Sequence, residues 1–211
     1  PPPSLSALRS LSSSASQVTY ASPSGAVTAP VALTDATGAF SLEVPTPEPG
    51  ATILVSGGAC TDAGTGLAPP VALGAVLPRG ASASSSSFAA VNGITTLAYY
   101  TAKNAGAPQV APYLALMGGS KATPGGAPAV FDAGAFYAAA GAYLGIPSAK
   151  DGATADLLGD LLASGSPAAA AGYSLSAQVL AALAVGSQGL AGLKPDVTPD
   201  AAAEAMVVAT F

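Results

Sequence analysis

The sequence lacks several residue types on which enzyme chemistry depends. It contains no histidine, no tryptophan and only one cysteine among 211 residues. Without histidine there is no Ser-His-Asp triad, and one cysteine is too few for a Cys-rich zinc site. A cysteine nucleophile needs a base beside its thiol, and histidine, the usual base, is missing. We therefore expect a protein that is not an enzyme and that carries no cofactor.

Charged residues are also scarce. They make up 8% of the chain, against roughly 25% in an ordinary soluble domain. The net charge is −5, and the six cations are scattered along the sequence. Nucleic-acid binding requires clustered Lys and Arg, and a helix on a membrane surface requires a basic face, so we expect neither partner. We expect attached sugars or packing against other subunits to provide the solubility that charge would otherwise give.

No apolar run reaches the ~20 residues that are needed to span a bilayer. The best candidate, residues 177–193, is interrupted by two glutamines, a serine and three glycines. The sequence therefore predicts no membrane insertion within this chain.

The first segment, residues 1–17, is rich in proline and serine. It begins with Pro1, Pro2 and Pro3, and consecutive prolines favour the extended polyproline II conformation. It is interpreted as a stalk or linker, with a disordered tail as the alternative. The opening prolines indicate a processed start or a segment of a longer polypeptide. Hydroxylation and O-glycosylation are expected at these three prolines, since Pro/Ser-rich extracellular segments are common carriers of sugar.

Residues 18–94 have the pattern of a small antiparallel β-sandwich. In residues 39–45, Phe40, Leu42 and Val44 alternate with smaller or polar residues, which is typical of a half-buried strand. Residues 25–33 and 51–57 are two further β-prone runs, and 67–78 is predicted to form a strand pair that its prolines confine to a sheet edge.

Residues 95–211 are predicted to form an Ala-rich helical bundle, so the fold class is α+β. Alanine has the highest helix propensity, and Gly, Pro and Ser separate the helical runs. The first helix is expected to be capped by Thr95 or Thr96 and a later one by Ser174. The last helix is expected to begin near Thr198, with Pro199 in its first turn.

Two aspartates, Asp35 and Asp62, lie in the similar loops "TDATG" and "TDAG". Each can shape its turn by accepting hydrogen bonds from nearby backbone N–H groups. Each can also provide one oxygen ligand to calcium, with backbone carbonyls completing the shell. The turn is the favoured interpretation, because one carboxylate per loop provides few of the oxygen ligands that calcium requires.

The single cysteine, Cys60, lies in the loop "VSGGACTDAGTG". It has no partner for an internal disulfide. It is therefore either a candidate for an intermolecular disulfide or a small buried apolar residue.

The order of three segments, "LTDATGAFSLEVP", "ATILVSGGACTDAGTG" and "NGITTLAYY", resembles a recurring module of secreted surface proteins. In that module a β-sandwich of the carboxypeptidase-regulatory type precedes a helical region. The similarity covers roughly residues 25–104, although "NGI" replaces the "TPL" that opens the module's helical region. The matching residues are Asp35, Gly38, Phe40, Ser56, Gly57, Gly58, Thr61, Asp62, Gly66, Thr95, Thr96 and Leu97.

The bias toward Ala, Gly, Pro and Ser, with the "PPPS" start, is also similar to green-algal extracellular and ciliary-surface glycoproteins rich in hydroxyproline. Both resemblances imply a non-enzymatic structural or assembly module of a larger Pro-rich surface glycoprotein in a cell wall, matrix or ciliary filament. Its expected partners are other protein subunits, and glycans. The alternative is a carbohydrate- or calcium-dependent binding module, for which Tyr20, Tyr99, Tyr100 and Tyr113 are the aromatic side chains able to stack on sugar.

Overall fold

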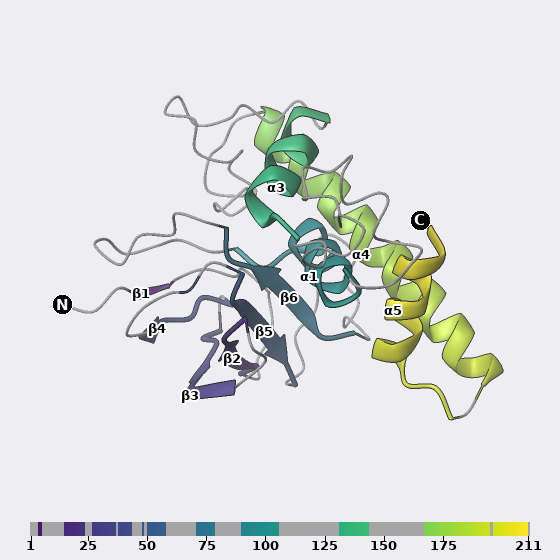
Figure 1. Ribbon diagram of the computed structural model, residues 1–211, viewed down its shortest axis with the longest axis horizontal. Coiled ribbons are helices and arrows are strands. Elements are labelled where there is room, and N and C mark those ends of the chain that lie inside the picture. The colour runs from purple at the N-terminus through teal and green to yellow at the C-terminus, as the bar shows by residue number, and fades with distance from the viewer. Residues whose placement is uncertain are drawn as a thin grey trace, which may run out of the picture.

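The structure, a computed structural model, describes residues 4–5, 15–23, 27–36, 38–43, 48, 50–57, 71–78, 90–105, 131–143, 167–194 and 196–210. Within these residues the chain contains a four-stranded antiparallel sheet, a separate two-stranded pair and four helices (Figure 1). The predicted α+β class is therefore confirmed. Pro1, Pro2, Pro3, Cys60 and Asp62 lie outside the described residues.

The four-stranded sheet has the order β3-β2-β5-β6. Its strands are β2 (Gln17–Ala21), β3 (Val27–Leu33), β5 (Thr52–Ser56) and β6 (Leu73–Val76), and the two-stranded pair joins β1 (Ser4–Leu5) to β4 (Leu42–Glu43). The runs predicted at 25–33, 39–45 and 51–57 each contain a strand. The run 67–78 is predicted as a strand pair, and its described residues, 71–78, contain one strand, β6. β6 lies at one edge of the sheet, as its flanking prolines predict.

One face of the four-stranded sheet contributes its side chains to the larger core cluster, which also contains side chains from the helical region. Residues opposite one another in register share a face, which places Tyr20 beside Ile53 and Ile53 beside Ala75. All three are at most 3% exposed, and they belong to one core cluster with Phe40 and Leu42. Phe40 and Leu42, two of the three apolar residues that alternate in 39–45, therefore point into the core.

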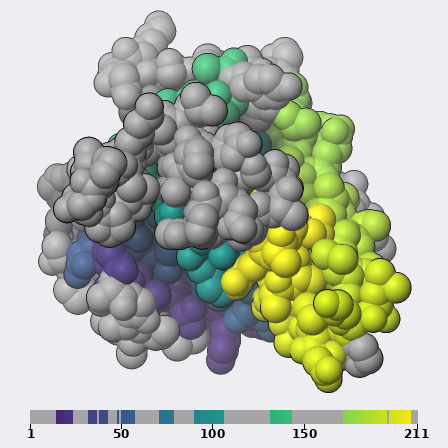
Figure 2. Space-filling view, turned by 45° about the vertical axis from the view of Figure 1, so that its right-hand side comes forward, coloured from purple at the N-terminus to yellow at the C-terminus, as the bar shows by residue number. Residues whose placement is uncertain are grey.

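The opposite face of β6 is covered by helices. α1 (Gly93–Lys103) packs on β6, and α3 (Ala133–Tyr143) adds Phe136 and Tyr137 to a second core cluster that includes Val76. α4 (Pro167–Leu193) and α5 (Pro199–Thr210) pack against each other and against α1. The two helices form one flank of the molecule in the view of Figure 2.

Two predicted helix starts are wrong. α1 begins at Gly93 with Asn92 as its N-cap, not Thr95 or Thr96, because the Asn92 side chain accepts hydrogen bonds from the backbone N–H groups of Ile94 and Thr95. Thr95 instead completes a capping box by accepting from the Asn92 N–H. Ser174 lies inside α4, which begins earlier, at Pro167, where proline and the alanines after it favour a helical first turn. The first-turn position of Pro199 in α5 is confirmed.

Candidate functional site

Among the residues that the structure describes, the clearest arrangement of polar groups lies along the outer edge of β6. The Leu77 N–H donates to the Ala51 carbonyl at 2.8 Å, so Leu73, Ala75 and Leu77 direct their backbone groups toward β5. Because direction alternates along a strand, the N–H and C=O groups of Ala72, Gly74 and Val76 point away from the sheet. Such groups at a strand edge are usually left to water or to another strand.

Two buried hydroxyl groups satisfy Gly74 and Val76. Thr96 Oγ1 on α1 accepts from the Gly74 N–H at 3.1 Å and lies 3.4 Å from the Gly74 carbonyl, to which it donates. The Tyr137 hydroxyl on α3 accepts from the Val76 N–H at 3.2 Å and donates to the Val76 carbonyl at 3.1 Å. Both side chains are fully buried. Each hydroxyl therefore takes the place of a neighbouring strand at its residue.

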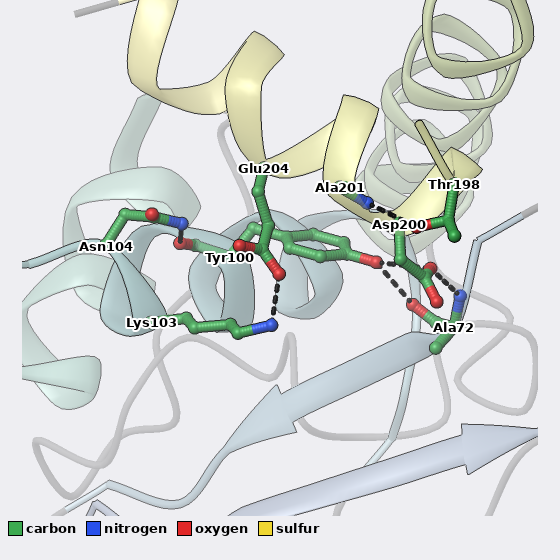
Figure 3. A network of polar contacts seen from close by, with 8 residues as sticks. All are labelled: Ala72, Tyr100, Lys103, Asn104, Thr198, Asp200, Ala201 and Glu204. Carbon is green, nitrogen blue, oxygen red and sulfur yellow. Dashed lines mark hydrogen bonds and ion pairs between the residues drawn. The ribbon is translucent and has the colours of Figure 1, made fainter. Parts of the chain in front are cut away.

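A carboxylate and a third hydroxyl satisfy Ala72 (Figure 3). Asp200 Oδ1 in the first turn of α5 accepts from the Ala72 N–H at 2.8 Å and from the Tyr100 hydroxyl at 3.0 Å. That hydroxyl also lies 3.3 Å from the Ala72 carbonyl, so its single proton is shared between two acceptors. This cluster joins α1, α5 and the residue that precedes β6. We call Ala72, Gly74, Val76 and the four side chains that bond to them the β6 edge network.

A second contact joins α5 to α1 one turn further along. Lys103 forms an ion pair with Glu204. The Asn104 side chain donates to the Tyr100 carbonyl at 2.9 Å, and Thr198 Oγ1 accepts from the Ala201 N–H at 3.2 Å (Figure 3). Thr198 therefore caps α5 and positions the helix turn that carries Asp200.

Burial keeps the hydroxyl groups of this network protonated. Desolvation raises the pKa of Tyr100 far above its ordinary value of 10.0, and the charge of Asp200 raises it further. Desolvation likewise raises the pKa of Tyr137. The hydrogen bond to Glu204 raises the pKa of Lys103. At neutral pH the two tyrosines are therefore hydrogen-bond donors rather than bases or nucleophiles, which is chemistry suited to holding elements together.

Asp35, predicted as a turn former or a calcium ligand, is engaged in a turn. Its Oδ1 accepts from the Ala39 N–H at 3.0 Å, and its own N–H donates to the Ala39 carbonyl at 2.8 Å. Gly38 completes the turn with a φ of 78°, a conformation that favours glycine. Among the described residues no group of three or more His, Cys, Asp or Glu side chains could hold a metal ion. Calcium binding by Asp35 stays a prediction.

Two of the four tyrosines proposed for sugar stacking, Tyr20 and Tyr100, are buried in the structure. Tyr100 is 1% exposed and Tyr20 is 3% exposed, so neither ring can receive a sugar. The Tyr20 hydroxyl accepts from the Glu48 N–H at 3.0 Å instead. Tyr99 is partly buried against β6, and Tyr113 lies outside the described residues.

Sequence reasoning missed the structural role of Thr96, Tyr100, Tyr137 and Asp200. The spacing of Thr96 and Tyr100 was a usable signal, because residues four apart lie on the same helix face. Nothing local marked Tyr137 or Asp200, whose bonds to Val76 and Ala72 cross 61 and 128 sequence positions.

One described segment has the length and composition of a membrane span. Residues Ala171–Leu193 of α4 are long and apolar enough to cross a bilayer, and 22% of the qualifying window is buried inside the protein. A single such helix is weak support for a span, since helices of soluble proteins can meet the same criteria. The predicted absence of membrane insertion stays a prediction.

Comparison of the chain with protein-family models, curated proteins and solved structures returned no match.

Proposed function

We propose that this chain is a non-enzymatic extracellular module with a structural or assembly role in a larger Pro-rich surface glycoprotein. The observation that carries the proposal is a contrast between the interior and the surface. The polar side chains of the β6 edge network tie three helices to one strand. The end of α4, in contrast, exposes apolar side chains: Val185 is 67% exposed and Leu193 is 81% exposed. We propose that these side chains, together with the exposed Leu190, belong to an apolar surface that packs against other subunits.

The charge distribution on α4 supports the same proposal. From Pro167 to Leu193 the helix contains no charged residue. A partner subunit can pack against such a helix without the cost of desolvating charged groups. The proposed partners are other protein subunits of the assembly, and glycans.

We also propose a finer architecture: a small β-sandwich followed by a helical bundle. Phe40 and Leu42, in and beside β4, share a core cluster with Val18 and Ile53 of the four-stranded sheet. This is the expected arrangement if the β1–β4 pair belongs to a second layer. On the helical side, α1, α4 and α5 contact one another. Both features agree with the resemblance to the carboxypeptidase-regulatory type of surface-protein module.

The proposed location is the cell wall, extracellular matrix or ciliary surface. There Pro1, Pro2 and Pro3 would be hydroxylated and would carry O-linked sugar, and Cys60 would form a disulfide with another chain. Such a disulfide persists in an oxidising extracellular environment.

Mass spectrometry of the native protein, on intact chains and glycopeptides, with and without reduction, tests this proposal. We expect sugar on the opening prolines or a reducible bond at Cys60. An unmodified chain with a free thiol would contradict the proposal and favour the alternative binding module. Calcium-dependent thermal stabilisation that disappears in the Asp35→Asn/Asp62→Asn double variant would then identify the calcium-dependent form of that alternative.

A further inference from the structure

The attachment of α5 to the rest of the protein differs from that of α1 and α3. Among the side chains of α5 that the structure describes, from Pro199 to Val207, the buried ones are small: Ala202, Ala203 and Val207. Alanine has little apolar area to remove from water, so burial contributes less here than it does for α1 or α3. The docking of α5 therefore depends to a greater degree on its polar contacts with α1 and Ala72.

These polar contacts are charged and reachable by water. Asp200 is exposed, and in the Lys103–Glu204 pair the two side chains are 48% and 26% exposed. The groups that bond α1 and α3 to β6, in contrast, are the neutral and fully buried hydroxyls of Thr96 and Tyr137. Charge-assisted hydrogen bonds weaken when the charge is removed, and exposed charges are screened by salt.

We propose that α5 is a releasable strap that is held closed by the negative charge of Asp200. When that charge is removed or screened, α5 separates from α4 and α1, while the sheet, α1 and α3 stay folded. The groups that act on this carboxylate are the Tyr100 hydroxyl and the Ala72 N–H, with Tyr99, Lys103 and Glu204 nearby. This regulation goes beyond the proposed function and does not depend on it.

Opening of the strap would uncover a defined surface. The apolar side chains of Leu180 and Leu183 on α4 share a core cluster with Ala203 and Val207 of α5, and they would lose this cover. Met206, whose side chain lies over Gly186, would also leave. The strap would therefore control how much apolar surface the protein presents.

Amide hydrogen exchange read by mass spectrometry tests the proposal on the full chain. Asp200→Asn keeps an oxygen acceptor and removes the charge. A charged hydrogen bond is stronger than a neutral one by an amount that corresponds to about a tenfold change in the equilibrium between docked and released α5. We therefore expect the α5 amides to exchange about ten times faster in Asp200→Asn than in the wild-type protein. Amides of β5 and α1 should keep their wild-type rates. Asp196→Asn, which removes the same charge in the exposed linker before α5, is the matched control and should leave α5 unchanged.

A salt titration of the wild-type protein provides a second measurement that needs no variant. Raising NaCl to about 1 M shortens the Debye length to about 3 Å, and α5 exchange should rise while β5 exchange does not. Equal exchange in Asp200→Asn and wild type would overturn the proposal. A parallel rise in α5 and β5 would also overturn it, because it would show that α5 opens only when the whole protein unfolds. If Asp200→Asn does not fold, the salt titration decides between these outcomes.

Discussion

At the scale of single residues, three hydroxyl groups and one carboxylate close the outer edge of β6. Thr96 and Tyr137 each bond to the N–H and the C=O of one residue, and Tyr100 with Asp200 does the same for Ala72. A strand edge with free backbone groups is a template for pairing with another chain. These side chains remove that template at three successive outward-facing residues.

The hydroxyl of Tyr137 can be removed with little change in shape. Tyr137→Phe leaves the N–H and C=O of Val76 buried without this partner, so we expect a loss of about 1–3 kcal/mol in the free energy of unfolding. Urea denaturation followed by circular dichroism measures it. Tyr99→Phe, at a neighbouring tyrosine outside the β6 edge network, is the control and should cost less. Equal losses in the two variants would argue against the edge role of Tyr137.

Gly74 is required by the close approach of α1 to β6. A Cβ at this position would lie 2.5 Å from Cγ of Tyr99 and 2.8 Å from its Cβ, so the helix would have to shift. We expect Gly74→Ala to destabilise the protein by about 1–3 kcal/mol, as overpacking typically does.

Gly189→Ala is the matched comparison for Gly74→Ala. Gly189 lies in α4, and a Cβ there meets no atom within 4 Å. Since alanine is a better helix former, this variant should gain about 0.5–1 kcal/mol. The same urea titration measures both variants, and effects of the same sign would contradict the packing seen at Gly74.

At the scale of elements, the start of α1 is fixed by its capping box and by its contact with α4. The Gly93 N–H donates to Ser176 Oγ at 2.8 Å, and a Cβ on Gly93 would lie 2.0 Å from the Ser176 carbonyl oxygen. The first turn of α1 is therefore held both by Asn92 and by the neighbouring helix.

Replacement of the cap tests this arrangement. Asn92→Ala removes the acceptor for the N–H groups of Ile94 and Thr95, and should cost about 1 kcal/mol, within a range of about 0.5–2 kcal/mol. Asn92→Asp keeps an acceptor oxygen and should retain most of the stability. Thermal or urea unfolding measures both variants. An equal loss in Asn92→Asp and Asn92→Ala would mean that the amide makes a contribution other than capping.

At the scale of the whole molecule, buried tyrosines link stability to alkaline pH. The pKa values of Tyr100 and Tyr137 are raised above the ordinary 10.0 in the folded protein, chiefly by burial. The unfolded chain therefore loses these protons first. The stability they contribute is fully present below pH 10, and it is lost as the pH rises toward their folded pKa values.

We expect the free energy of unfolding to fall as the pH rises above about 10, with a contribution from Tyr137 of about 1.4 kcal/mol per pH unit. Urea titrations on either side of this pH measure the slope, and Tyr137→Phe should make it shallower. Ultraviolet absorbance of phenolate should show ionisation of these tyrosines only on unfolding. A stability that does not change above pH 10 would contradict the burial of these side chains.

Much of the local structure could be predicted from the sequence. The alternation at Phe40 and Leu42 gave their burial, and the TDATG composition gave a turn at Asp35. Pro199 marked the first turn of α5. Each of these features depends on neighbouring residues, so the pattern carries it. The start of α1 was predicted wrongly, because Asn92 and Thr95 are both good capping residues. The contact of Gly93 with Ser176, which helps to fix that start, is made by a helix more than eighty positions away.

The sequence by itself determined the α+β class, the edge position of β6 and the scarcity of groups for catalysis, because composition and periodicity act locally. Only the tertiary structure decided which polar groups meet. Tyr100 was a candidate for sugar stacking until packing placed it between β6 and α5 with Asp200 as its acceptor. The packing of the helices on the sheet decides which hydrogen-bond partners meet across 61 to 128 sequence positions. No local sequence pattern indicates these pairs.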